Sequence, residues 1–241
     1  MDGQTAVWLN LIIGVSAFVS SLTGFGYALV ATPFLVLVFA PRLAVPVVAV
    51  SWIPLALLLS WEARREMQPG RIATWGAGAA VGIPLGVYAL AHLEGGAMRA
   101  GIGGLTLLAA LSLWLKPARP LRHERPVGVL AGLVSGIMGG ATGMSGPPVI
   151  LFGLNQGWPH VALRANLIGY FAAKHVLSLV LLREFGILDR HALLLGAASL
   201  PGMVLGYAAG MRLKDHVSQR HFRILAFVLV LAGGLLALLK H

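Results

Sequence analysis

Eight apolar runs follow one another along the chain, with short polar stretches between them. Most of these runs are close to 20 residues long, the length of helix that crosses a bilayer once. Two are too long for one ordinary crossing, because residues 6–39 would form a helix of roughly 50 Å and residues 127–155 one of about 43 Å. The pattern predicts an all-α, polytopic integral membrane protein with two unusual segments. The runs cover residues 6–39, 43–61, 72–91, 97–115, 127–155, 161–182, 191–210 and 222–239.

Each overlong run contains a short break that is rich in glycine. The first break reads Thr23-Gly24-Phe25-Gly26, and the second reads TGMSGPP at residues 142–148. Glycine and proline interrupt helices, and an interruption leaves backbone N–H and C=O groups without partners. In hydrocarbon such groups must be buried in protein or line a watery cavity. We therefore expect both breaks at the centre of the molecule, unless the glycines only allow helices to pack closely.

The two halves of the chain correspond in sequence. Thr142 lies 119 residues after Thr23, so the breaks align. Further on, residues 82–89 and 202–209 share two glycines, a leucine and an alanine at an offset of 120. These matches predict a duplication. We expect a first transmembrane repeat at residues 1–118, a basic cytoplasmic linker at 119–126, and a second transmembrane repeat at 127–241.

The basic residues between the runs predict the orientation, because Lys and Arg accumulate in cytoplasmic loops. The richest loops are 62–71, 116–126 and 211–223. If all three are inside, the loop at 183–190 is outside, although it corresponds to loop 62–71. The repeats are then inverted, as in many secondary transporters. Each broken segment becomes a re-entrant hairpin or two short crossings, with arms of roughly 13–17 residues. A parallel arrangement of four plain spans per half is the alternative.

Composition agrees with a lipid environment. The chain is 58% hydrophobic and 11% charged, whereas soluble domains are about 25% charged. Its net charge of +10 lies mainly in loops, so we expect no nucleic-acid partner. There is no cysteine, and we find no HExxH pattern, Walker loop or nucleophile–base pair. We therefore expect no metal, no cofactor and no enzymatic activity.

The charged residues inside the runs point to an anion. All eight acidic residues lie at termini, in loops or at the edges of runs, which argues against a cation transporter. Lys174 and His175 lie in the middle of the 161–182 run, and an intramembrane lysine marks a transport pathway unless it snorkels to the interface. For His175 a packed, hydrogen-bonded position is the alternative. Helix N-termini after the breaks would offer N–H groups to the same anion. The candidate substrate-binding residues are Thr23, Gly24, Gly26, Tyr27, Ser51, Thr142, Gly143, Ser145, Gly146, Asn166, Lys174 and His175.

Three stretches carry a resemblance to a known family. SSLTGFGYALVATPFL, GGATGMSGPPVILFGL and RANLIGYFAAKHVLSLVLLREFGILD resemble the TauE/SafE family of sulfite exporters. The resemblance covers essentially the whole chain. It implies a multi-pass protein of the bacterial inner membrane that moves sulfite, organosulfonates such as sulfoacetate, or related small anions. It also implies a binding role for Thr23, Gly24 and Gly26, and for Thr142, Gly143, Ser145 and Gly146.

The combined expectation is a secondary transporter for a small oxyanion or sulfonate. One repeat would rock against the other and expose the site alternately to the two sides. The alternatives are a passive anion channel and, less favoured, a membrane enzyme or an assembly factor. The sequence leaves the anion, the direction of transport, the coupling ion and the oligomeric state open, a homodimer included.

Overall fold

The computed structural model describes residues 3–112, 121–213, 228 and 231–239. Parts of the predicted linker 119–126, of the loop 211–223 and of the run 222–239 lie outside the described residues. Within the described part of the chain the structure is helical and contains no strand. The helices are α1 (Gly3–Thr23), α2 (Tyr27–Leu35), α3 (Pro41–Ala63), α4 (Pro69–His92), α5 (Gly95–Ser112), α6 (Glu124–Thr142), α7 (Gly146–Asn155), α8 (His160–Glu184), α9 (Arg190–Ala198) and α10 (Leu200–Leu213), and residues 231–239 are also helical.

Several of these helices are long and apolar enough to cross a membrane. Among the described residues, α1, α3, α4 and α8 qualify individually. Helices α9 and α10 qualify as a pair, bent by 42° at Ser199. The predicted all-α, polytopic membrane protein is thereby confirmed.

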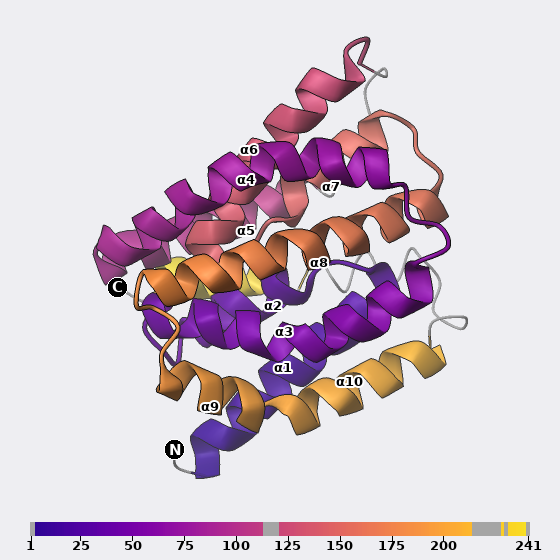
Figure 1. Ribbon diagram of the computed structural model, residues 1–241. Coiled ribbons are helices and arrows are strands. Elements are labelled where there is room, and N and C mark those ends of the chain that lie inside the picture. The colour runs from indigo at the N-terminus through magenta and orange to yellow at the C-terminus, as the bar shows by residue number, and fades with distance from the viewer. Residues whose placement is uncertain (1–2, 113–120, 214–227, 229–230, 240–241) are drawn as a thin grey trace.

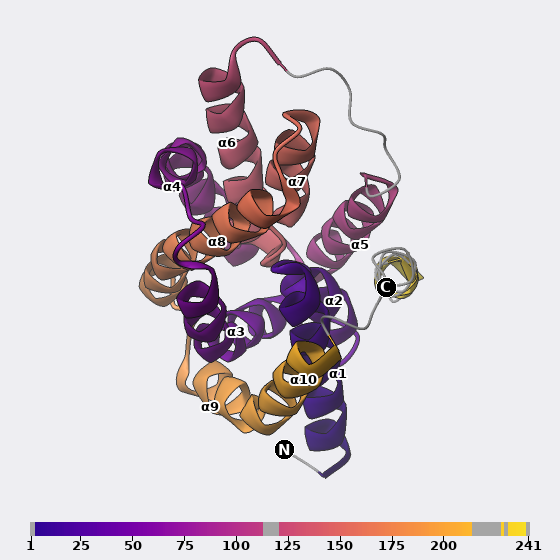
Figure 2. The ribbon, with the colours of Figure 1, turned by 90° about the vertical axis from the view of Figure 1, so that its right-hand side faces the viewer.

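The helices form two layers. In Figures 1 and 2, α4, α6, α7 and α8 lie in the upper layer, and α1, α3, α9 and α10 lie in the lower one. Helix α8 contacts α3 across the boundary between the layers. Helix α5 and the helical segment 231–239 lie at one edge, where Gly103 faces Leu238.

Helix boundaries recur at the spacing of the sequence matches. The first break ends α1 at Thr23, and the second ends α6 at Thr142, which is 119 residues later. Helix α7 likewise begins 119 residues after α2, and α8 begins 119 residues after α3. The breaks and the helices that follow them therefore have the same layout in both halves.

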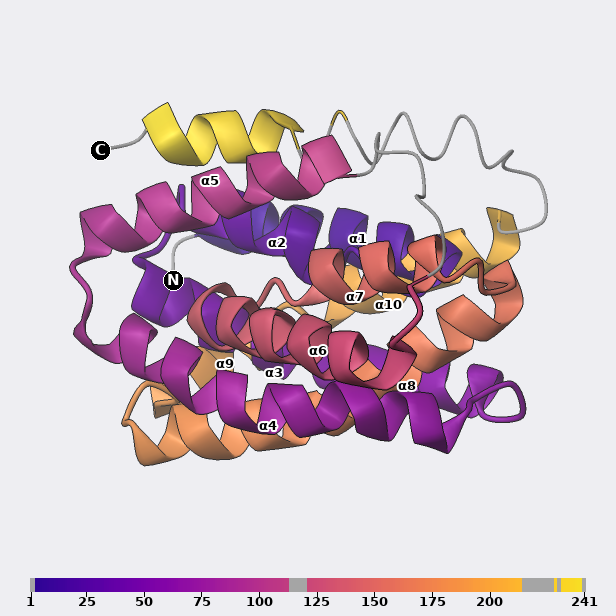
Figure 3. The same ribbon diagram turned by 90° about the horizontal axis from the view of Figure 1, so that it is seen from above.

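The arms of the broken segments are unequal, so the expected lengths of about 13–17 residues are wrong. Helix α1 has 21 residues and α2 has 9, while α6 has 19 and α7 has 10. In Figure 3, α7 turns back alongside α6. The long arm continues until the first glycine with a positive φ, and the short arm ends well before the next crossing helix begins.

Helices α4 and α6 pack with their backbones in contact. A Cβ atom on Gly82 would collide with the carbonyl of Leu133, and one on Gly86 would collide with the carbonyl of Ile137. Glycine therefore brings the two backbones into direct contact. The residue numbers of the facing positions rise together along both helices, so α4 and α6 run parallel.

Helix α10 packs on α1 in the same manner. Gly202 faces the backbone of Asn10, and Gly206 faces that of Gly14, again in parallel. The Asn10 side chain adds two hydrogen bonds, accepting one from the Gly202 N–H at 2.8 Å and donating one to the Ala198 carbonyl at 3.0 Å. Both glycine-lined contacts join a helix of the first half of the chain to a helix of the second half.

Candidate functional site

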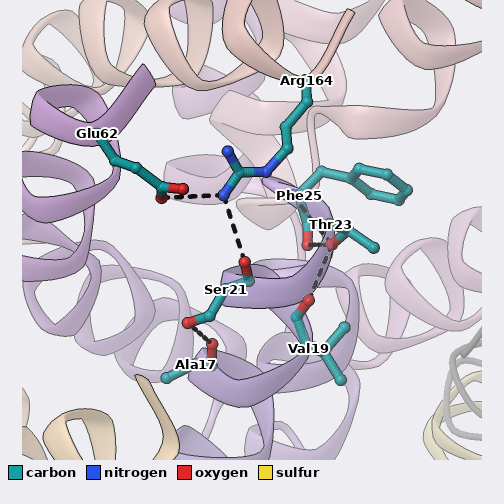
Figure 4. Close-up of polar contacts among 7 residues, drawn as sticks. All are labelled: Ala17, Val19, Ser21, Thr23, Phe25, Glu62 and Arg164. Carbon is teal, nitrogen blue, oxygen red and sulfur yellow. Dashed lines mark hydrogen bonds and ion pairs between the residues drawn. The ribbon is translucent and has the colours of Figure 1, made fainter. Parts of the chain in front are cut away.

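The first break is held by its own threonine. Gly24 and Gly26 have φ of 79° and 91°, a region that glycine adopts without strain. The Thr23 hydroxyl accepts a hydrogen bond from the Phe25 N–H at 3.2 Å, and it lies within donating distance of the carbonyls of Val19 (2.9 Å) and Phe25 (2.6 Å) (Figure 4). These contacts satisfy backbone groups that the end of α1 leaves open.

The second break repeats this geometry. Gly143 has φ of 77°. The Thr142 hydroxyl donates to the Met138 carbonyl at 2.7 Å and accepts from the Met144 N–H at 3.2 Å. Helix α7 then starts with prolines 147 and 148 in its first turn, where a missing N–H costs no helical hydrogen bond. In both halves the threonine stabilises the turn itself.

Both breaks line one cavity. Its volume is about 70 Å³, several times the roughly 10–15 Å³ that one water needs, so it has room for a small anion. Eight of the twelve predicted site residues line it, and they come from the two breaks, α2, the start of α7 and the middle of α8. These residues are Gly24, Gly26, Tyr27, Gly143, Ser145, Gly146, Lys174 and His175.

The other four predicted residues, Thr23, Ser51, Thr142 and Asn166, do not line the cavity. Thr23 and Thr142 stabilise the breaks. Ser51, on α3, accepts a hydrogen bond from the Tyr27 hydroxyl at 2.8 Å and so fixes a side chain that lines the cavity. The side-chain oxygen of Asn166 accepts from the Gln68 N–H at 2.7 Å, which joins α8 to the start of α4.

Lys174 brings a cationic group into the cavity. The residue is only 8% exposed, and its ammonium group forms no hydrogen bond or ion pair with the described residues. A Cβ atom on Gly139 would lie 3.0 Å from Nζ, so the ammonium group rests on the last turn of α6. The C-terminal end of a helix carries partial negative charge, which stabilises a cation there. This contact allows a buried lysine to stay without a carboxylate partner.

His175, the next residue, faces α3. Its Nε2 lies 2.7 Å from the carbonyl of Ala49, to which it donates, and its ring lies 4.8 Å from that of Trp52. The imidazole therefore forms one wall of the cavity, and its Nε2 already donates a hydrogen bond to the Ala49 carbonyl.

Backbone donors are distributed unequally between the two breaks. Within the described part of the chain, the N–H groups of Tyr27, Ala28 and Leu29 at the start of α2 have no backbone acceptor. At the start of α7, Pro147 and Pro148 have no N–H to offer. An anion would therefore find more donors at the first break than at the second.

In the second break, the carbonyl of Ser145 accepts a hydrogen bond at the end of a short chain of hydroxyl groups. The Tyr170 hydroxyl lies 2.8 Å from the Ser135 hydroxyl, which in turn donates to the Ser145 carbonyl. A carbonyl oxygen facing the cavity would repel an anion, and this chain holds the oxygen on the side of Ser135.

Sequence reasoning missed Ser178. It lines the cavity, is 5% exposed, and its hydroxyl has no hydrogen-bond partner among the described residues. It lies four residues after Lys174 on α8, which puts both side chains on one face of the helix. That spacing was the signal that could have identified it.

Comparisons with known proteins identify the family of the chain. The sequence profile described as "Sulfite exporter TauE/SafE" matches residues 9–237. Over 239 residues the chain is 26% identical to the "Probable sulfite/organosulfonate exporter TauE" of Cupriavidus necator (strain H16), covering 94% of this chain and 91% of that protein. No solved structure matches the chain. The chain belongs to the sulfite exporter TauE/SafE family, a family of membrane transport proteins rather than enzymes.

Proposed function

We propose that this protein is a secondary transporter that moves a small anion across the bacterial inner membrane by alternating access. The substrate is sulfite, an organosulfonate such as sulfoacetate, or a related oxyanion. The observation that carries the proposal is the buried ammonium group of Lys174 in a cavity lined by both helix breaks. The family and the name of the C. necator relative support an anionic sulfur compound.

The anion would bind between three kinds of donor. Lys174 supplies the charge, the first turn of α2 supplies N–H groups, and Ser178 supplies a hydroxyl. Hydrogen bonds to ionised groups are roughly twice as strong as those between neutral groups. A sulfite or sulfonate group has three oxygens, so it can engage all three kinds of donor at once.

The charges around the cavity favour an anion over a cation. No Asp or Glu lies among the described residues that line the cavity, whereas Lys174 does. The carbonyls of Ala49 and Ser145, two residues that line the cavity, already receive hydrogen bonds from His175 and Ser135. The site therefore offers donors with few competing acceptors.

Alternating access is supported by the asymmetry of the cavity. The α3 residues that line it lie between Val45 and Trp52, in the first half of that helix. Those of α8 lie between Phe171 and Leu182, from the middle of that helix almost to its end. The cavity thus extends toward one end of the molecule, where α3 begins and α8 ends. The orientation from basic loops makes this the outer side.

The test is transport by purified protein in liposomes. Labelled sulfite and sulfoacetate should enter in a saturable manner, and a trapped unlabelled anion should drive counterflow of the labelled one. Inorganic sulfate and acetate provide the comparison for substrate class. Flux that does not saturate, with conductance and without counterflow, would replace the transporter by a passive channel. The absence of flux for every anion would refute the proposal.

A further inference from the structure

Arg164 lies against the first break, at the end of the cavity opposite Ser178. A Cβ atom on Gly24 would lie 2.7 Å from Cγ of Arg164, so the arginine stem covers the turn that lines the cavity. Arg164 is ten residues before Lys174 on α8, or about 15 Å along the helix. It therefore lies toward the end where α8 begins and α3 finishes.

The guanidinium group joins three helices. Its Nη2 lies 3.1 Å from Oε2 of Glu62 on α3 and 3.4 Å from the carbonyl of Ser21 on α1 (Figure 4). Arg164 belongs to the upper layer, whereas Glu62 and Ser21 belong to the lower layer. These contacts join the two layers at the end where α3 ends and α8 begins. The cavity extends toward the opposite end.

The ion pair is only partly buried. The Arg164 and Glu62 side chains are 23% and 27% exposed, so water and dissolved ions reach them. A carboxylate and a sulfonate or sulfite group offer similar oxygen acceptors to a guanidinium group. An arriving anion can therefore compete with Glu62 for Arg164.

We propose that Arg164 is a second anion-binding residue, at the entrance on the side where α3 ends, and that the Glu62 carboxylate occupies it while that side is closed. An anion that takes Arg164 from Glu62 breaks the tie between α8 and α3 and opens this end of the cavity. Without an anion the ion pair closes it again. This inference rests on the proposed transport of small anions.

The closure can be tested by thiol labelling, because the chain contains no cysteine. Ala28→Cys places a thiol on the cavity wall. A membrane-impermeant maleimide is added from the side of residues 64–68, the loop after α3. Glu62→Gln should raise the labelling rate by up to about fivefold, as expected for loss of a part-exposed ion pair. Arg164→Gln should do the same.

The matched control is Glu66→Gln, which removes an exposed carboxylate four residues further along the chain. It should leave the rate unchanged. The charge-reversed double variant Glu62→Arg/Arg164→Glu should restore slow labelling, which also shows that the double variant folds. Equal labelling rates in all these variants would overturn the proposed closure.

Anion binding to Arg164 is tested separately, in a Lys174→Met background that weakens the central site. Binding of labelled sulfoacetate should become tighter with Glu62→Gln and should disappear with Arg164→Gln. If neither changes the residual binding, Arg164 is not an anion site. Failure of this inference can be told apart from failure of the proposed function. If labelling responds to Glu62→Gln but no anion is transported, the proposed transport is refuted. If anions are transported but labelling does not respond to Glu62→Gln, the proposed closure is refuted.

Discussion

Replacement of Lys174 by methionine is the most direct test of the cavity as an anion site. Methionine has a similar length and no charge, so it fills the same space beside Gly139 without leaving a void. The change removes the ammonium group and leaves the α2 N–H groups and the Ser178 hydroxyl in place. Any loss of affinity can then be assigned to the charge.

The magnitude follows from the burial of Lys174, a residue that is only 8% exposed. Two unit charges 4 Å apart interact by about 4 kcal/mol at an effective dielectric constant of about 20, and a hydrogen bond to a charged group contributes about 1.5–3 kcal/mol. Since each 1.4 kcal/mol is about tenfold in affinity, we expect Kd to rise by roughly 10- to 1,000-fold. Lys174→Ala should weaken binding in the same way.

The assay is equilibrium binding of labelled sulfite or sulfoacetate to purified protein, paired with thermal unfolding. The unfolding temperature should stay the same or rise, because Lys174→Met removes a buried charge that has no partner among the described residues. Arg190→Met provides the matched control, since it removes one positive charge from an exposed position at the start of α9. Its affinity should equal that of the parent.

Two results would refute this reasoning. Unchanged affinity in Lys174→Met would remove the lysine from the site. Equal losses in Lys174→Met and Arg190→Met would show that net charge, rather than the cavity, attracts the anion.

Three further predictions test the geometry around the ammonium group and the orientation of the chain. Gly139→Ala places a methyl group 3.0 Å from the ammonium group of Lys174 and should lower the affinity for the anion without removing any donor. The control is Gly101→Ala, where the added methyl group meets no atom within 4 Å and the affinity should not change. Binding assays on both variants test this prediction. Ser135→Ala frees the carbonyl of the second break to face the anion and should raise Kd by about fivefold, measured in the same assay. Single cysteines at Arg65 and Arg190 should react with an impermeant reagent from opposite sides of the membrane, and labelling of both from one side would contradict the inverted orientation.

Local sequence features predicted the helices and the breaks well. Apolar length identifies a membrane-spanning helix, and glycine with proline marks its interruption, so the ends of α1 and α6 follow from the residues at each break. The intramembrane position of Lys174 also follows from the sequence, because a charge in an apolar run is conspicuous whatever the fold. These features depend on neighbours within a few residues.

The features that the sequence did not predict depend on contacts between distant residues. The pairing of Arg164 with Glu62 joins positions 102 residues apart, and no local pattern indicates it. Thr142 looked like a ligand because its hydroxyl lies in a break, but the hydroxyl bonds to the backbone of its own turn. Whether a hydroxyl faces a cavity or its own backbone is decided by side-chain geometry, which composition does not reveal.

The glycine-lined contact between α1 and α10 has a consequence for how the protein is made. The Asn10 side chain forms hydrogen bonds with residues 188 and 192 positions later, so the first helix of the chain reaches the bilayer long before the helix that covers it. Until α10 is inserted, the backbone face of α1 has only lipid or the translocation machinery beside it. Synthesis must therefore be nearly complete before the lower layer can form, and either half of the gene expressed alone would yield helices without their partners.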